Sequence, residues 1–332
     1  MPIAVRSFAK INLGLKIGPT RADGYHELRT VYQTLALHDV VHADVQPGSG
    51  IEIRCPDPRV PLDASNTCYR IAERVLATTK ARGKVVIQID KQLPVQAGMG
   101  AASSNAVATM LGLERALKTK ISPEDKQRIA AEVGSDLPLF LIGGTVLGIG
   151  RGEEVYPLQD LPTLHLVVVT PPIGVSTPHA FAQWDALVAR EAELTGAGAA
   201  GTINEFGQGV FAWLSESVFS RAVSASEPAS GVPAVGGDRA ETPLLDLVRA
   251  GIENDFERVV FPEYPDLREV KRVLEREGAR YASLSGSGST LYGLFGSVVE
   301  AQSAAARMSA SGHAAVATTT LMRDEYWRKM FA

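Results

Sequence analysis

Residues 94–105 read Pro94-Val95-Gln96-Ala97-Gly98-Met99-Gly100-Ala101-Ala102-Ser103-Ser104-Asn105. The segment lies between residues 85–89, whose alternating apolar pattern predicts a strand, and residues 103–118, whose apolar spacing predicts a helix. Small residues let a ligand approach the backbone, and a helix start offers unpaired N–H groups and a positive dipole end. The side-chain oxygens of Ser103, Ser104 and Asn105 can meet phosphate or magnesium. The segment indicates an anion site, although a small-residue helix start packed tightly on a sheet fits the same composition.

The composition is that of a globular protein large enough for two domains. The chain has 332 residues, of which 45% are hydrophobic and 21% charged, and this balance excludes a wholly disordered chain. Its formal net charge of −4 gives no overall attraction to nucleic acid or to an anionic membrane. The longest apolar runs, residues 164–169 and 137–142, are too short to cross a bilayer, and the first residues lack the apolar region of a signal peptide. Cys55 and Cys68 have no zinc-binding or disulfide-framework spacing. We therefore expect a cytoplasmic protein that binds neither nucleic acid nor a membrane.

The order of the expected elements favours an α+β fold with two domains. The first half has strand patterns at 3–8, 11–17, 31–37, 40–45 and 51–55 and helix patterns at 66–79 and 122–133. The second half has strand patterns at 164–170, within 281–295 and at 314–320, and helix patterns at 244–248, 267–277 and 298–311. Strands that precede helices, rather than alternate with them, argue against a doubly wound sheet. We divide the chain into an N-terminal domain, residues 1–160, and a C-terminal domain, residues 161–332, with a flexible insertion near 222–242.

Two charged residues interrupt apolar sequence. Asp136 lies within residues 134–140, where it could simply cap the short helix that follows. Lys10 lies within the apolar strand pattern, where its ammonium either reaches solvent or sits beside an acid. If the two side chains meet, each compensates the other. A carboxylate beside a lysine could then accept a hydroxyl proton, which suits phosphoryl transfer to an alcohol.

Two further segments carry possible ligand contacts. Tyr25 and His26 follow an Asp-Gly turn, and they could stack on a base and hydrogen-bond to it. Residues 283–290 form a glycine- and serine-rich turn between two strand patterns. A plain hairpin turn is the simpler interpretation of this second segment, and a second phosphate-facing loop is the alternative.

Several blocks together resemble the GHMP kinase superfamily over nearly the whole chain, apart from about residues 186–245. They occur in the order Phe8-Ala9-Lys10-Ile11-Asn12-Leu13, Asp23-Gly24-Tyr25-His26, residues 94–105 and residues 134–140. Residues 253–257 and 285–288 support the resemblance in the second half. The Asp-Gly-Tyr-His block is the most discriminating, since other GHMP kinases share the phosphate loop but not this segment. It resembles the branch of the superfamily that acts on 4-diphosphocytidyl-2-C-methyl-D-erythritol.

The resemblance implies a fold and an activity. The fold would be a β-rich α+β N-terminal domain and a ferredoxin-like C-terminal domain, with the active site in the cleft between them. The activity would be ATP-dependent phosphorylation of the C2 hydroxyl of 4-diphosphocytidyl-2-C-methyl-D-erythritol, in the non-mevalonate route to isoprenoid precursors. The alternatives are a homoserine- or mevalonate-type GHMP kinase, or a metabolite-sensing protein of this fold without turnover. We expect a monomer or a weak homodimer.

The resemblance also implies roles for particular residues. Asp136 would take the hydroxyl proton, and Lys10 would orient the hydroxyl and stabilise developing charge. The 94–105 loop would hold the ATP phosphates, with Mg²⁺ bridging the β- and γ-phosphates and no side chain assigned as its ligand. Asn12 would contact the substrate near the reacting centre, and the residues that grip the cytosine would be Tyr25, His26 and Phe181.

The phosphate loop departs from the family pattern Gly-Leu-Gly-Gly-Gly-Ser-Ser. Alanine stands at Ala101 and Ala102, and Gln96 stands where glycine or another small residue is common. Because alanine avoids positive φ, we expect the loop to hold the nucleotide slightly differently.

Overall fold

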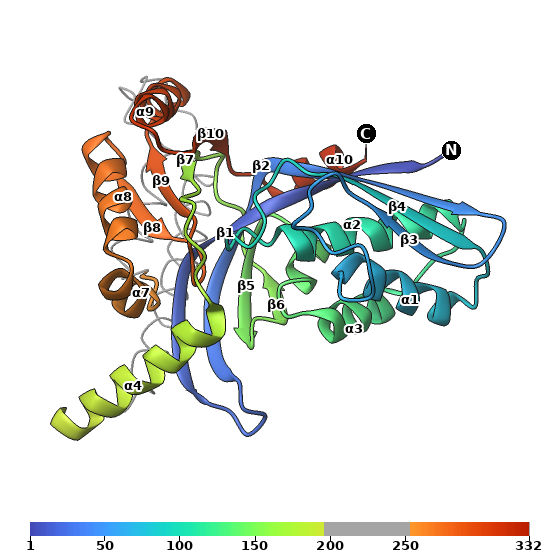
Figure 1. The fold of residues 1–332 in the computed structure, drawn as a ribbon, viewed down its shortest axis with the longest axis horizontal. Helices are drawn as coiled ribbons and strands as arrows, with labels where there is room; N and C mark the ends of the chain where they lie inside the picture. Colours follow the sequence, from blue (N-terminus) through green and yellow to red (C-terminus); the bar gives the residue numbers. More distant parts are fainter. Residues whose placement is uncertain (196–252, 332) are drawn as a thin grey trace, which may run out of the picture.

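The computed structural model describes residues 1–195 and 253–331, and these form two β-sheets with helices packed against them (Figure 1). The first sheet has the order β3-β4-β2-β5-β6, with β1 paired to β2; the second has the order β10-β7-β9-β8. The predicted α+β fold is confirmed. The expected insertion at 222–242 and the helix expected at 244–248 lie outside the described residues. The strands of the first sheet are β1 (Ile3–Thr20), β2 (His26–Gln46), β3 (Gly50–Arg54), β4 (Lys84–Asp90), β5 (Thr145–Gly150) and β6 (Glu154–Pro157), and those of the second are β7 (His165–Val169), β8 (Tyr281–Leu284), β9 (Leu291–Phe295) and β10 (Ala315–Thr319).

Strands β1 and β2 form one long antiparallel hairpin that belongs to the first sheet and also packs against the second (Figure 1). The sequence predicted two shorter strands in place of each, and this was wrong. In β1 the register shifts between Phe8 and Lys10, between Asn12 and Gly14, and near Pro19, so bulges absorb the irregular positions without ending the strand. In β2 the expected break at Asp39 does not occur, because donors from elsewhere in the chain satisfy its buried carboxylate. Residues along the β1–β2 hairpin that lie near different sheets can therefore belong to the same site.

Helices α1 (Thr67–Thr79), α2 (Ala101–Ala116) and α3 (Pro123–Val133) pack with the first sheet (Figure 1). Asn66 caps α1 by accepting a hydrogen bond from the Cys68 N–H at 2.8 Å. Ser122 caps α3 in the same way through the Asp125 N–H at 3.0 Å, as its sequence predicts. Helix α2 begins before the predicted Ser103 and ends before the predicted residue 118.

Three clusters of buried apolar side chains form the core of the protein. The first lies between the first sheet and helices α1–α3, and it also takes Tyr326 and Met330 from α10 (Arg323–Met330). The second joins the sheets directly, with Ile11 of β1 packed in the same cluster as Leu166 of β7 and Tyr292 of β9. The third lies between the second sheet and α4 (Thr177–Thr195), α7 (Glu257–Glu263), α8 (Pro265–Arg276) and α9 (Val298–Ala310). Strand β1 contributes to all three clusters, with Val5 in the first, Ile11 in the second and Leu15 in the third.

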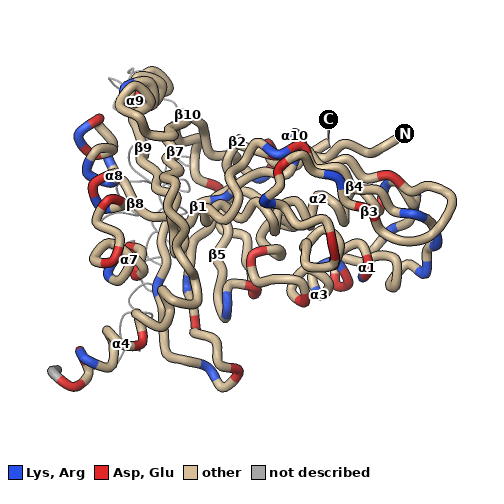
Figure 2. Tube along the Cα trace, viewed as in Figure 1, with Lys and Arg blue, Asp and Glu red and all other residues tan. Residues whose placement is uncertain are grey.

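The short helix expected after Asp136 is the 3₁₀ helix η1 (Pro138–Leu141). The elements that were not predicted from the sequence are β5, β6, α4, α7 and α10. Acidic and basic segments alternate along α7 and α8 (Figure 2). Within the described ranges, no helix is long and apolar enough to span a membrane.

Candidate active site

Lys10 and Asp136 meet where β1 passes the start of η1. Lys10 is 3% exposed, and its Nζ lies 3.3 Å from Asp136 Oδ2. Bulges on either side of the Lys10–Asn12 segment set the direction of these side chains. The alternative in which Asp136 caps the following helix is wrong, because Leu137 occupies the cap position and makes no side-chain cap bond. The structure thus brings together the two charges that the sequence could only place in separate segments.

Two neutral side chains orient this pair. Asn12 Oδ1 accepts a hydrogen bond from Lys10 Nζ at 2.7 Å, while its amide donates to Thr30 Oγ1 at 2.8 Å. Tyr32 donates from its hydroxyl to Asp136 Oδ1 at 3.2 Å. Burial and the neighbouring Asp136 carboxylate raise the pKa of Tyr32 well above its ordinary value, so the hydroxyl stays protonated and remains a donor. The sequence analysis missed Tyr32; its signal is a polar aromatic residue within an otherwise apolar strand.

The glycines at positions 98 and 100 shape the phosphate loop. Both have positive φ, 78° for Gly98 and 68° for Gly100. A Cβ at Gly100 would lie 2.9 Å from the Phe140 ring and 3.0 Å from Lys10 Cγ, so the loop packs directly against Lys10. The Lys10 N–H also donates to the carbonyl of Met99 at 3.0 Å. The loop and the pair are therefore parts of one site.

The two alanines of the loop fall in the first turn of α2, outside the positions of positive φ. The expectation of a different nucleotide geometry rested on alanine avoiding positive φ. Since neither Ala101 nor Ala102 has a positive φ, that reason does not apply to them. Gln96 differs, because its φ of 57° is in the region that favours glycine. The strained position of the loop is consequently Gln96.

A cavity of about 290 Å³ lies along the loop. Residues 94–103 and Asn105 line one side of it, and Arg59 and Lys91 supply cationic side chains on its wall. The start of α2 has no side-chain cap, which leaves N–H groups of its first turn for a ligand. The cavity combines unpaired N–H donors and a helix N-terminus with two cationic side chains, which pair with Asp57 and Asp39. The donors and the helix N-terminus are suited to phosphate groups.

Two of the polar side chains expected to face phosphate have partners inside the protein. Ser104 accepts a hydrogen bond from Ser7 at 2.8 Å and is buried. Asn105 donates from its amide to Asp39 Oδ2 at 3.1 Å. Its Oδ1 atom is buried and has no hydrogen-bond partner within the part of the chain that is described. Ser103 remains half-buried on the cavity wall.

Asp39, which the sequence analysis missed, connects the two ends of the phosphate loop. Its carboxylate is fully buried and accepts hydrogen bonds from Lys91 Nζ at 2.5 Å and from the Gln92 and Leu93 N–H groups at 2.7 Å each. Together with Asn105, these donors flank the loop on both sides. In the sequence, Asp39 is an acidic residue between two apolar runs, which is the same kind of pattern that drew attention to Lys10.

The second glycine-rich segment packs on the first. A Cβ at Gly98 would lie 2.7 Å from the Ser285 carbonyl oxygen and 2.8 Å from that of Gly288. The Thr290 N–H donates to the Ala97 carbonyl at 3.2 Å, and Ser285 Oγ donates to that of Gly98 at 3.2 Å. Residues 97–98 and 285–290 thus form a seam, which we call the loop seam. The segment is more than a plain hairpin turn, since it supports the phosphate loop.

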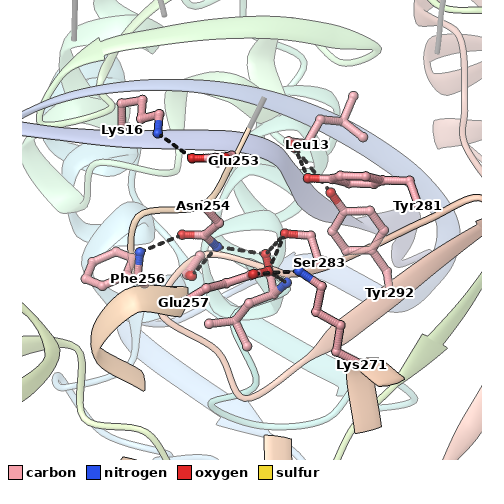
Figure 3. Close-up of polar contacts among 12 residues, drawn as sticks. Leu13, Lys16, Glu253, Asn254, Phe256, Glu257, Lys271, Tyr281, Ser283 and Tyr292 are labelled. Carbon is pink, nitrogen blue, oxygen red and sulfur yellow. Dashed lines mark hydrogen bonds and ion pairs between the residues drawn. The ribbon is translucent and has the colours of Figure 1, made fainter. Parts of the chain in front are cut away.

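Asn254 fixes the start of the second segment (Figure 3). Its amide donates to the carbonyls of Leu284 and Gly286 at 2.7 and 2.8 Å, and its Oδ1 accepts from the Phe256 N–H at 3.0 Å. Glu257 adds contacts with Ser283 and the Leu284 N–H, at 2.8 and 2.9 Å. The 253–257 block thereby supports the loop seam.

The aromatic residues expected to grip a base lie where the β1–β2 hairpin meets α4 (Figure 1). The rings of His26 and Phe181 stack, with centroids 4.8 Å apart and planes 9° from parallel. His26 Nε2 lies 2.7 Å from Asp185 Oδ1, a partner that the sequence analysis did not identify. Tyr25 is 55% exposed, and its ring faces the Arg151 guanidinium at 4.9 Å. The structure joins His26 to Phe181 and places Tyr25 beside Arg151.

A protein-only metal centre finds no support in the described parts of the chain. No group of three or more His, Cys, Asp or Glu side chains there could hold an ion. Among the residues that line the cavity, Ser103 and Asn105 carry side-chain oxygens of the kind that magnesium prefers, and Asn105 Oδ1 has no partner among the described residues.

Comparison with known proteins assigns the class and then the family. Residues 66–144 match the model of the GHMP kinases N terminal domain, and residues 241–314 match that of the GHMP kinases C terminal domain. The fold is thus that of the GHMP kinases, which are ATP-dependent phosphotransferases. The chain is 36% identical over 293 residues to the 4-diphosphocytidyl-2-C-methyl-D-erythritol kinase of Solibacter usitatus, covering 88% of this chain and 80% of the relative. It is 32% identical over 320 residues to the kinase of the same name from Moorella thermoacetica, covering 96% and 99%.

A solved structure agrees with these relatives. It is that of a 4-(cytidine 5'-diphospho)-2C-methyl-D-erythritol kinase, with a TM-score of 0.68, 28% identity, and coverage of 96% of this chain and 99% of the other. The chain belongs to the 4-diphosphocytidyl-2-C-methyl-D-erythritol kinase family. The resemblance seen in the sequence is confirmed.

Proposed function

We propose that this chain transfers the γ-phosphoryl group of ATP to the C2 hydroxyl of 4-diphosphocytidyl-2-C-methyl-D-erythritol, with Lys10 and Asp136 at the reacting hydroxyl. The observation that carries the assignment of residues is the 3.3 Å contact between Lys10 and Asp136 beside the phosphate loop. Family membership supports the substrate and argues against a homoserine- or mevalonate-type acceptor. We also propose the division into domains at residue 160, cytoplasmic action, and a monomer or weak homodimer.

Asp136 accepts the hydroxyl proton in this proposal. Its side chain is 34% exposed, so a substrate can reach the carboxylate while Tyr32 and Lys10 hold it. Lys10 has three N–H donors, of which Asn12 and Asp136 engage two. The third is available to the oxygen that is phosphorylated or to the transferring group, where a positive charge stabilises the transition state. Asn12 keeps the ammonium in this direction.

The ATP phosphates bind at the start of α2 in this proposal. The N–H groups of the 94–105 loop and the Lys91 ammonium supply donors and positive charge along the cavity. Mg²⁺ would neutralise charge on the β- and γ-phosphates, and Ser103 and Asn105 offer oxygens that fit it. Phosphoryl transfer depends mainly on such positioning and electrostatics.

The cytosine binds at the tip of the β1–β2 hairpin in this proposal. The parallel rings of His26 and Phe181 form an apolar surface for a base, and Asp185 fixes the orientation of the imidazole. Tyr25 supplies a second exposed ring, with Arg151 against one of its faces.

The test is ADP release with ATP, Mg²⁺ and a panel of acceptors. The panel contains the cytidyl-diphosphate methylerythritol, homoserine, mevalonate and galactose. Turnover with the first alone is expected. Turnover with another acceptor, or ATP binding without turnover of any, would overturn the proposal.

A further inference from the structure

A second cavity lies at the C-terminal end of α2, whose N-terminal end lies at the phosphate loop. Its volume is about 480 Å³, and none of its lining residues lines the cavity at the phosphate loop. The walls are mainly apolar, with Leu111 from α2, Leu141 from η1, and Trp327 and Phe331 from the C-terminal segment. Such a volume and lining are typical of sites for small organic ligands.

Among the residues that the structure describes, one cation at this cavity has no carboxylate partner. Lys126 and Glu114 neutralise each other at 2.7 Å. Arg115 stacks on the Phe331 ring, with its guanidinium carbon 3.1 Å from the ring centroid, and among the described residues no carboxylate pairs with it. A guanidinium held by an aromatic face still presents N–H donors at its edge.

We propose that this cavity is an effector site for a small amphipathic anion, whose apolar body packs between α2, η1 and α10 and whose acidic group binds Arg115. Charge complementarity indicates an acidic group on the ligand, because Arg115 is the charge at the cavity that has no carboxylate partner among the described residues. The apolar walls indicate that the rest of the ligand is apolar, since a fully hydrated metabolite would gain little binding free energy from contact with Leu141 and Trp327.

The walls of this cavity are continuous with the catalytic elements. Helix α2 starts at the phosphate loop and reaches the cavity at Leu111 and Arg115. Asp136 stands two residues before Pro138, the first residue of η1, and Pro138 lines the cavity. Helix α10 holds the same segment, because Trp327 Nε1 donates to the Ile142 carbonyl at 3.0 Å. A ligand that moves η1 therefore moves the backbone that carries Asp136.

Two dyes with the same ring system test the site. They are 8-anilinonaphthalene-1-sulfonate, which is anionic, and N-phenyl-1-naphthylamine, which is neutral. Each is titrated by fluorescence with ATP and Mg²⁺ at saturation, so that the nucleotide cavity is blocked. The variants are Arg115→Gln and Leu141→Trp, and the matched control is Arg128→Gln on α3, whose guanidinium pairs with Asp125 and Glu132 outside the cavity.

The dissociation constant of the anionic dye should rise by about tenfold in Arg115→Gln, the usual effect of losing a hydrogen bond to a charged group. The neutral dye should not respond to this change, both dyes should weaken in Leu141→Trp, and Arg128→Gln should match the wild type. Equal binding of the anionic dye by wild type and Arg115→Gln would overturn the site. Displacement of the dye by ATP would also overturn the site, as would dye binding that decreases when the protein self-associates.

The effector role has its own readout. At saturating substrates, the anionic dye should change kcat at least twofold in the wild type and leave kcat of Arg115→Gln unaltered. A kcat that is the same with and without bound dye would overturn this part. Dye binding requires no turnover, so these results are independent of the roles proposed for Lys10 and Asp136.

Discussion

Asp39→Asn should both destabilise the protein and weaken ATP binding. Asparagine keeps an oxygen for the Gln92 and Leu93 N–H groups, but it turns an NH₂ group toward the Lys91 ammonium and the Asn105 amide. Two donors then face two donors in a position that is 0% exposed. Lys91, whose side chain is 7% exposed, also loses its counter-charge.

The size of the effect follows from this geometry. Removing one partner of a buried ion pair costs about 3–5 kcal/mol. Lys91 borders the nucleotide cavity and can turn toward solvent, so we expect the lower end of the range, about 3 kcal/mol. For a chain of 332 residues, with an unfolding entropy of about 2.1 cal/mol/K per residue, that corresponds to a fall in Tm of about 4 °C. Because Lys91 and Asn105 both line the cavity, the Kd for ATP should rise by about tenfold or more.

The assays are urea unfolding followed by circular dichroism, and calorimetric titration with ATP. The control is Asp44→Asn on the same strand, where the carboxylate accepts from the Gln46 amide at the surface. The control should stay within about 0.5 kcal/mol of the wild type. The reasoning fails if Asp39→Asn stays within that limit too, or if it unfolds early but binds ATP with unchanged affinity.

Three more predictions concern the site and the core. Asp136→Asn should lower kcat by about 10²- to 10⁴-fold and leave the Kd for ATP nearly unchanged, because a general base acts on the reacting hydroxyl only. Loss of ATP binding would instead give Asp136 a structural role. His26→Ala should raise KM for the cytidyl substrate by about tenfold, because a stacking contact and a hydrogen bond are lost. KM for ATP is the internal control. An unchanged KM for the cytidyl substrate would exclude recognition of the base by His26. Burial raises the pKa of Cys68 from its ordinary 9.0 to about 12, so the folded protein keeps the thiol proton at a pH where the unfolded chain loses it. The free energy of unfolding should therefore fall as pH rises from 9 toward 12, and Cys68→Ala should flatten this slope in urea unfolding. An equal slope in both proteins would contradict the assignment.

The fold class and the charged pair of the site could be predicted from the sequence for a physical reason. Lys10 and Asp136 each interrupt an apolar segment, and a buried charge requires a compensating partner. Helix starts with strong local signals were also predictable, such as Ser122 followed by a proline.

Features that depend on distant partners could not be predicted in this way. Asp39 reads locally as a break between two strands, and it is tolerated inside β2 only because residues 91–93 and 105 supply donors more than fifty positions away. The His26–Asp185 contact joins a hairpin to a helix 159 residues later. Strand β5 is rich in glycine, so its pattern has few side chains from which to recognise a strand.

The loop seam limits how this nucleotide site can be rebuilt. A graft that replaces residues 96–100 alone introduces a new loop against the old carbonyls of Ser285 and Gly288, which leave no room for a side chain at position 98. The two segments are nearly two hundred residues apart in the chain, yet they form a single surface. A chimera between family members should therefore exchange residues 96–100 and 284–290 as one module, and recombination points between them separate parts that fit only each other.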